Sequence, residues 1–309
     1  EGFANDAAWS WWPIAEISVV PVALALGALA LVAFALYERA RLRAKKSILI
    51  DFTLFSIPTF RYGNIAGTIV SLGEFGVLFA IPLFLAAVQQ YSAFETGLCF
   101  VPLALGSFIA APMAPSLTKR FGARRVVTLG MFLEALGIGA IALLISPEST
   151  GVQLLVPFLV YGIGVGFATA QLANVTLSEV DIPRAGIASG TNSTTRQIGS
   201  ALGIAIIGTT LFTLIGERSR TALEGVPELM ARPGAIDGVV AVMKSSAGQV
   251  LPALANDPQV DPVLRAKIVE ALSQAFADAA RGAGIVAFLF VCLGLAASLA
   301  LPKERNAKR

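Results

Sequence analysis

The stretch YGNIAGTIVSLGEFGVLFAIPLFLAAV, residues 62–88, decides the fold class of this chain. It is apolar along its length apart from a few small polar side chains and one charged residue, Glu74. A membrane-spanning helix needs about 20 mostly apolar residues, because each residue advances the helix by about 1.5 Å. Without water the backbone must satisfy its own hydrogen bonds, so the run predicts a transmembrane helix.

Six further runs have the same character, and the chain as a whole is poor in charge. The predicted helices span residues 14–36, 62–88, 96–117, 126–145, 152–176, 195–215 and 282–301. Of the 309 residues, 56% are hydrophobic and 14% charged, against about 25% charged in a typical soluble domain. We therefore predict an all-α, polytopic membrane bundle of seven transmembrane helices.

The composition also excludes several kinds of chemistry. The chain contains no His, so His-based metal sites and Ser-His-Asp triads are absent. Cys99 and Cys292 lie in apolar runs and predict buried hydrophobic side chains, not a disulfide framework. The net charge of +3 is too small to suggest a nucleic-acid partner. We expect no enzyme, no metal and no cofactor.

The short connections predict how the chain crosses the membrane. Lys and Arg follow the first, third, fifth and seventh runs, whereas residues 89–95 and 146–151 contain neither. Basic residues concentrate on the cytoplasmic side, so we expect the N-terminus of this segment outside and the C-terminus in the cytoplasm of a cell (inner) membrane. A long outer loop, 217–281, carries five prolines. Its last part, 263–281, predicts an amphipathic helix, because Ile268, Leu272 and Phe276 recur every four residues. We expect the loop to form a surface cap that lies on the membrane.

Two acidic residues, Glu74 and Glu134, interrupt apolar runs near their middles. A charge at the bilayer centre costs about 2.5–3.5 kcal/mol, so each side chain should face protein or water. Gly67 lies on the helical face of Glu74, and Gly130 and Gly137 flank Glu134. Burial favours a neutral carboxylic acid, which a proton-binding site needs. We predict proton coupling or binding of a substrate cation; the alternative is a hydrogen-bonded structural residue.

Small residues four apart predict close helix packing, because membrane helices associate where small side chains let them approach. These residues are Gly63, Gly67, Gly162, Gly166, Gly199 and Gly203, together with Ala280 and Gly284. A polar segment around 178–197 precedes the sixth run, and Ser189, Gly190 and Asn192 can begin that helix. Arg196 and Gln197 would then lie in its first turns. Arg196 either snorkels to headgroups or forms a cytoplasmic latch with Glu179 or Asp181.

Three stretches resemble a known family. They are IPLFLAAVQQYSAFETGLCFVPLALGSFIAAP (81–112), SLTKRFGARR (116–125) and AGIASGTNSTTRQIGSALGIAIIG (185–208). By these blocks the chain resembles the major facilitator superfamily, and within it the C-terminal part of the fourteen-helix drug:proton antiporters, the multidrug exporters related to EmrB and QacA. The third block is the most specific and includes Gly186. The second resembles a degenerate copy of the superfamily's inter-helix loop motif.

The second block departs from that loop motif in an informative way. Leu117, Arg120, Gly122 and Arg124 match motif positions, but Pro115 replaces the initial Gly and Lys119 replaces the Asp. The resemblance therefore implies a tight turn and basic anchoring here. It does not imply a charge-paired gate.

The resemblance implies that this chain is the C-terminal half of a longer transporter. Residues 1–61 would then hold an outer segment, a linker helix and a basic cytoplasmic loop, and residues 62–309 one six-helix bundle. The missing N-terminal half would be its partner, since two such bundles rock around a central site.

The first functional hypothesis is an exporter, driven by the proton gradient, for small amphipathic compounds. Protons and the lipid bilayer would be its other partners. Whether a periplasmic adaptor also takes part is left open by the sequence. Phe75, Phe79 and Phe84 either line an adaptable pocket or pack in the core. The second hypothesis is a porter for a specific metabolite or antibiotic. An anionic solute would need Arg or Lys at the midplane of the membrane, and we expect none within the helices there. A non-transporting sensor or membrane enzyme would depend on the weak polar cluster 192–197.

Overall fold

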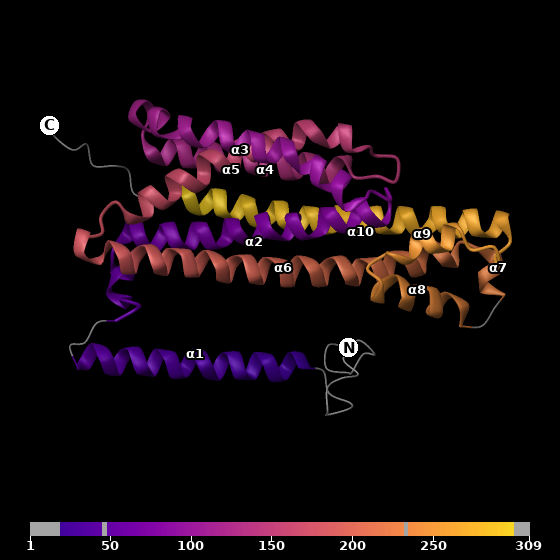
Figure 1. The fold of residues 1–309 in the computed structure, drawn as a ribbon, viewed down its shortest axis with the longest axis horizontal. Helices are drawn as coiled ribbons and strands as arrows, with labels where there is room; N and C mark the ends of the chain where they lie inside the picture. Colours follow the sequence, from indigo (N-terminus) through magenta and orange to yellow (C-terminus); the bar gives the residue numbers. More distant parts are fainter. Residues whose placement is uncertain (1–18, 45–47, 232–233, 300–309) are drawn as a thin grey trace. The chain divides into compact units, whose positions relative to one another are not determined.

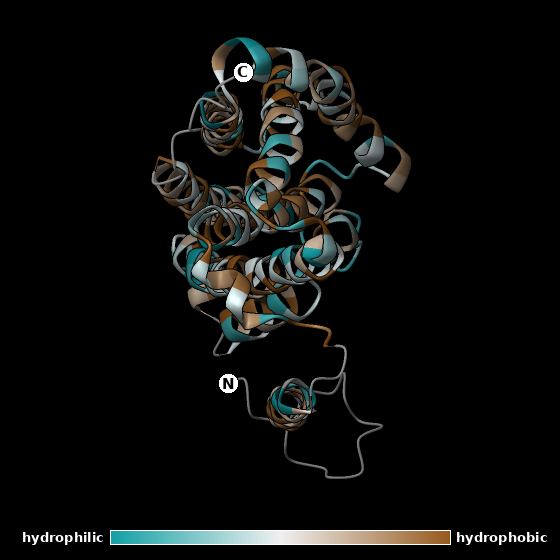
Figure 2. Ribbon diagram, turned by 90° about the vertical axis from the view of Figure 1, so that its left-hand side faces the viewer, coloured by the Kyte–Doolittle hydropathy of each residue, from teal (hydrophilic) through white to brown (hydrophobic). Residues whose placement is uncertain are grey.

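The computed structural model describes residues 19–44, 48–231 and 234–299, and within these ranges every regular element is helical. The long helices are α1 (Val19–Arg43), α2 (Pro58–Ala87), α3 (Ala93–Phe121), α4 (Ala123–Leu144), α5 (Gly151–Leu177), α6 (Ala185–Glu224) and α10 (Pro262–Ser298). Seven candidate spans are long and apolar enough to cross a membrane. The predicted all-α membrane architecture is confirmed, and hydrophobic residues colour most of the helical ribbons brown in Figure 2.

The short elements are η2 (Phe52–Ser56), η3 (Ile182–Arg184), α7 (Pro227–Met230), α8 (Ala235–Ser245) and α9 (Val250–Ala255). By its contacts the chain divides into two units, Glu1–Phe52 and Thr53–Arg309. The first unit contains α1. Near the C-terminal end of α1, the carboxylate of Glu38 accepts hydrogen bonds from the backbone N–H groups of Leu49, at 2.6 Å, and Ile50, at 3.3 Å.

The second unit consists of two groups of three long helices (Figure 1). In one group α5 packs between α3 and α4, and in the other α2, α6 and α10 all contact one another. The two groups meet where α10 contacts α4 and where α2 contacts α5. The largest hydrophobic cluster draws on both groups and on the short helices α7, α8 and α9.

Glycines allow the helices in each group to approach backbone to backbone. A Cβ atom at Gly203 would lie 2.2 Å from the carbonyl oxygen of Leu72, and one at Gly199 would lie 2.4 Å from that of Thr68. These contacts bring α6 onto α2. Of the other predicted packing positions, Gly63, Gly162 and Gly166 are equally crowded, whereas at Gly67 a Cβ would meet neighbours only at 3.5 Å and beyond.

The prediction for the start of the sixth spanning helix was wrong. The helix α6 begins at Ala185, four residues before Ser189, the earliest start that the sequence indicated, because η3 turns the chain directly into it. The polar segment is helical, and its hydroxyls are satisfied by carbonyls one turn back: Thr191 donates to Ile187 and Thr194 to Gly190, both at 2.9 Å. Arg196 therefore lies about three turns inside α6.

The connection predicted as a long outer loop is also shorter than expected. The helix α6 continues to Glu224, and α10 starts at Pro262, where the side chain of Asp261 accepts from the N–H groups of Val263 and Leu264. The predicted amphipathic helix and the seventh spanning helix are thus one continuous helix, because no break separates them. Between α6 and α10, the helices α7, α8 and α9 form a folded cap whose buried side chains, such as Met243 and Leu251, continue the core.

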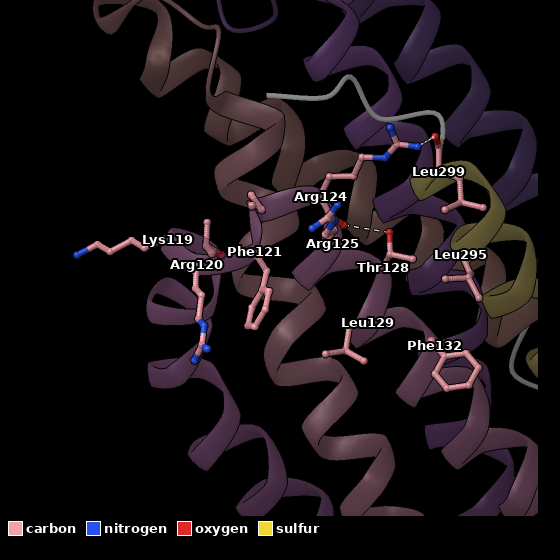
Figure 3. A pocket seen from close by; sticks show the side chains of 13 residues that line it. Lys119, Arg120, Phe121, Arg124, Arg125, Thr128, Leu129, Phe132, Leu295 and Leu299 are labelled. Atoms are coloured by element: carbon pink, nitrogen blue, oxygen red, sulfur yellow. Dashed lines mark hydrogen bonds between the residues drawn. The ribbon is translucent and has the colours of Figure 1, made fainter. Parts of the chain in front are cut away.

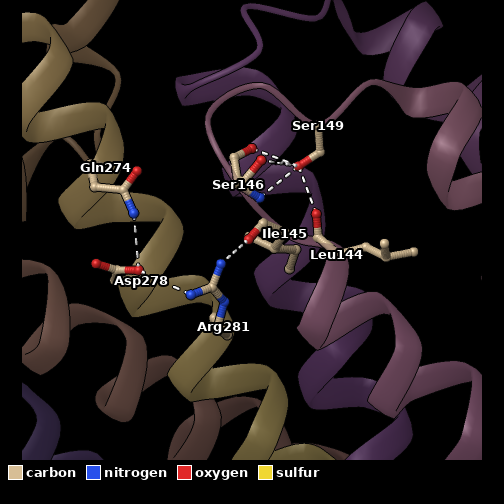
Figure 4. Close-up of polar contacts among 7 residues, drawn as sticks. All are labelled: Leu144, Ile145, Ser146, Ser149, Gln274, Asp278 and Arg281. Carbon is tan, nitrogen blue, oxygen red and sulfur yellow. Dashed lines mark hydrogen bonds and ion pairs between the residues drawn. The ribbon is translucent and has the colours of Figure 1, made fainter.

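Polar contacts fix the turn between α4 and α5 onto α10 (Figure 4). The Arg281 guanidinium donates to the carbonyl of Ile145 at 2.7 Å and pairs with Asp278 at 3.4 Å. Within the turn, Ser149 Oγ accepts from the N–H of Ser146 at 2.6 Å and lies 2.9 Å from the carbonyl oxygen of Leu144. The two helix groups are therefore joined at this end by directed bonds as well as by packing.

Candidate functional site

Three ionisable side chains from three helices of the second unit influence one another, and two of them form an ion pair. Glu74 on α2 and Arg196 on α6 form an ion pair with 3.9 Å between Oε2 and Nη2. Their side chains are 12% and 25% exposed. Glu134 on α4 is 1% exposed and interacts electrostatically with both of them. The two carboxylates that the sequence singled out separately therefore belong to one site, together with a cation that it had assigned elsewhere.

A fourth helix contributes Tyr161, which the sequence analysis missed. Its side chain is fully buried, and its hydroxyl donates to the backbone carbonyl of Glu74 at 3.4 Å. It also interacts electrostatically with Glu134. Gly137 permits this arrangement, since a Cβ there would lie 2.6 Å from the backbone nitrogen of Tyr161. The available signal was a lone tyrosine in the apolar run 152–176.

The carboxylates have unused hydrogen-bonding capacity. Among the described residues, Glu74 Oε2 and Glu134 Oε1 are buried without a hydrogen-bond partner, as are Ser71 Oγ and Gln171 Nε2. Leaving a buried polar group unsatisfied costs about 1–3 kcal/mol, and more when the group is charged. Such groups need an explanation, and a site that takes up a proton or a cation provides one.

The two alternatives for Arg196 both differ from the structure. Its predicted partners are engaged elsewhere: Asp181 pairs with Arg184 at 2.6 Å, and Glu179 accepts from the hydroxyl of Thr59 at 3.0 Å. Because α6 begins so early, the Arg196 side chain reaches inward to Glu74 instead of outward to headgroups. The expectation that no Arg or Lys lies inside the helices is corrected for the same reason.

The other residues of the 185–208 block divide into two sets. Asn192 donates to Oδ1 of Asn64 at 3.1 Å, and Thr195 donates to the same atom at 2.7 Å. These bonds join α6 to α2 near the Glu74 site, and Asn64 was detectable as an amide in an apolar run. Gly186, Ser189, Gly190 and Gln197 are exposed, and both glycines have open space where a Cβ would stand.

The residues of the inter-helix loop motif lie at the turn between α3 and α4. Gly122 alone separates the two helices and has φ 85°, a backbone conformation that favours glycine. Leu117 packs against a small hydrophobic cluster, and the guanidinium of Arg120 lies 5.3 Å from the ring centre of Phe121. Arg124 donates to the backbone carbonyl of Leu299 on the last turn of the described chain.

The three candidate pocket aromatics have different surroundings. Phe84 is fully buried and packs near Phe276, with 6.5 Å between ring centres, so it belongs to the core. Phe75 is partly exposed, and Phe79 lines a shallow recess with residues of α6.

Spanning helices that bury facing ionisable residues are typical of proteins that move solutes or protons across membranes. The chain belongs to the Major Facilitator Superfamily, whose pattern matches residues 6–204. It is a multi-pass membrane protein.

The chain is similar to proteins named for export. It is 36% identical over 259 residues to the cephamycin export protein CmcT of Amycolatopsis lactamdurans, covering 80% of this chain and 51% of CmcT. It is 31% identical over 200 residues to the putative multidrug resistance protein MdtD of Pectobacterium atrosepticum, covering 62% and 41%. Over 307 residues it is 24% identical to the tetracenomycin C resistance and export protein of Streptomyces glaucescens, covering 98% and 54%. The chain thus spans at most about half the length of these relatives.

Proposed function

We propose that this chain is the C-terminal half of a proton-coupled secondary exporter of amphipathic drugs or antibiotics that works by alternating access. The observation that carries this proposal is the ion pair of Glu74 and Arg196 inside the bundle, with a second buried carboxyl group, Glu134, on a neighbouring helix. The export function named for the relatives supports the class of cargo, and their greater length supports the assignment as a half. The cluster can be explained by binding and release of a proton and a substrate, without a chemical reaction.

The cluster suggests how a proton and a substrate exclude each other. With Glu74 ionised, the Arg196 guanidinium neutralises it across 3.9 Å. A proton on Glu74 removes that charge and releases Arg196 from the ion pair. A cationic substrate competes with the proton for the same carboxylate. Because the site holds only one added positive charge at a time, binding of a proton releases the cationic substrate, and binding of the substrate releases the proton.

The test is Glu74→Gln in the protein in its complete natural form. We expect efflux driven by a pH gradient in everted vesicles to be lost while the amount of protein in the membrane stays the same. Glu217→Gln is the matched control, since Glu217 is an exposed acid near the far end of α6. Unchanged efflux in Glu74→Gln would contradict the assignment of Glu74 to proton-coupled export.

A second candidate function, a porter for an anionic metabolite or antibiotic, gains support from Arg196, because that cation lies inside the bundle. Here Arg196 would bind the solute and Glu74 would only hold the guanidinium in place. The two functions separate in one comparison: Glu74→Gln should abolish exchange of a cationic substrate but leave binding of an anionic one measurable.

We further propose that the membrane is a cell (inner) membrane, with the α3–α4 and α5–α6 turns in the cytoplasm and the cap on the opposite side. The Lys and Arg residues of the short connections support this orientation.

A further inference from the structure

An open cavity of about 990 Å³ lies beside the turn between α3 and α4, close to the end of α10 (Figure 3). Its rim carries four basic residues, Lys119, Arg120, Arg124 and Arg125. Its wall is apolar. The proposed transport mechanism does not use this cavity, which lies on a different part of the bundle from the Glu74 cluster.

Among the described residues, no ion pair neutralises the positive charge of Lys119, Arg120 or Arg125. Figure 3 shows the side chains of Arg120 and Lys119 leading away from the turn in different directions. The cavity is therefore suited to an anion.

The wall of the cavity continues as an apolar stripe along α4. Arg125, Leu129, Phe132 and Leu136 follow one another at helical spacing, and the three apolar members are 42%, 52% and 51% exposed. Leu295 of α10 adds to the wall near its start. A soluble anion would need the basic rim alone, whereas a basic rim above an exposed apolar stripe matches a ligand with an anionic head and a long apolar tail.

We propose that this cavity binds an anionic phospholipid. Arg120 and Arg125 contact the headgroup phosphate, and an acyl chain lies along Leu129 and Phe132. Basic recesses between transmembrane helices are suited to such headgroups, and the cavity is large enough to admit one. The lipid would occupy the space between α3, α4 and α10 from the bilayer side.

The test uses the protein in its complete natural form, purified in detergent and given equal amounts of phosphatidylglycerol and phosphatidylcholine. Native mass spectrometry counts the bound lipids. We expect the wild type to retain phosphatidylglycerol preferentially, and the double variant Arg120→Gln/Arg125→Gln to lose at least tenfold in that preference, since each basic residue near an anionic lipid contributes about fivefold. The pair Arg120→Lys/Arg125→Lys should keep most of it.

The control removes two exposed charges outside the cavity, Arg61→Gln/Arg218→Gln, and should leave the preference unchanged. An equal loss in this control, or no loss in Arg120→Gln/Arg125→Gln, would overturn the proposal. Displacement of the bound lipid by inorganic phosphate would overturn it as well, because the cavity would then be a site for a soluble anion. Transport is not the readout, so failure here is distinguishable from failure of the exporter assignment.

Discussion

The ion pair between Glu74 and Arg196 should behave as a coupled unit. Removing one partner of a fully buried pair costs about 3–5 kcal/mol, because a charge is left unpaired. We expect about 2 kcal/mol for Arg196→Gln, since the pair is 3.9 Å apart and Arg196 is a quarter exposed. The double variant Glu74→Gln/Arg196→Gln should be less destabilised than the sum of the single variants, as measured by thermal unfolding in detergent. Strict additivity would show that the two side chains do not interact.

At the same scale, the candidate site was only partly predictable. Glu74 and Glu134 were found because a carboxylate in an apolar run has a known energetic cost. Their proximity was not predictable, since it depends on how α2 and α4 are placed by other helices. Tyr161 and Asn64 were missed for the same reason: each contributes through a contact to a residue more than 80 positions away in the sequence.

The packing of α6 on α2 can be tested with a pair of matched substitutions in one helix. Gly203→Ala places a Cβ 2.2 Å from the Leu72 carbonyl oxygen, so the two backbones must separate. We expect a lower unfolding temperature and less protein in the membrane. Gly190→Ala meets no atom within 4 Å and should stabilise the helix by up to about 1 kcal/mol through its better helix propensity. Equal unfolding temperatures for both variants would contradict the close approach.

The cap provides a second test at the level of elements. Leu272 on α10 is fully buried in the cluster that joins the cap to the bundle, whereas Val263 is 65% exposed. Leu272→Ala should cost about 2–5 kcal/mol, as for other buried leucines, and Val263→Ala less than about 0.5 kcal/mol. Limited proteolysis between α7 and α9 would report the loosened cap directly.

Apolar run length predicted the existence of all seven candidate spanning helices in the described residues, but it could not predict how far α6 and α10 extend beyond those runs. A run of apolar residues marks the part of a helix that lipid requires. The polar extensions 185–194 and 262–281 continue these helices through the η3 turn, an Asp261 cap and contacts with the cap helices, and none of these appears in a hydropathy pattern.

At the scale of the whole molecule, the proposed orientation can be tested by cysteine labelling. With Cys99 and Cys292 replaced by Ala, Glu148→Cys places a thiol on the exposed α4–α5 turn and Ser178→Cys places one at the opposite end of α5. A membrane-impermeant maleimide should label the first in intact spheroplasts and the second only after lysis. The reverse pattern would invert the topology.

The length of α6 has a mechanical consequence. Its 40 residues make a rod of about 60 Å, some 15 Å longer than a bilayer with its headgroups. The far end of such a rod moves about 10 Å when the rod tilts by roughly 10° about its other end. Because α8 packs on α6 and α9 on α10, the cap magnifies small rotations of the bundle. A spectroscopic probe on the cap would therefore follow conformational cycling without touching the Glu74 cluster.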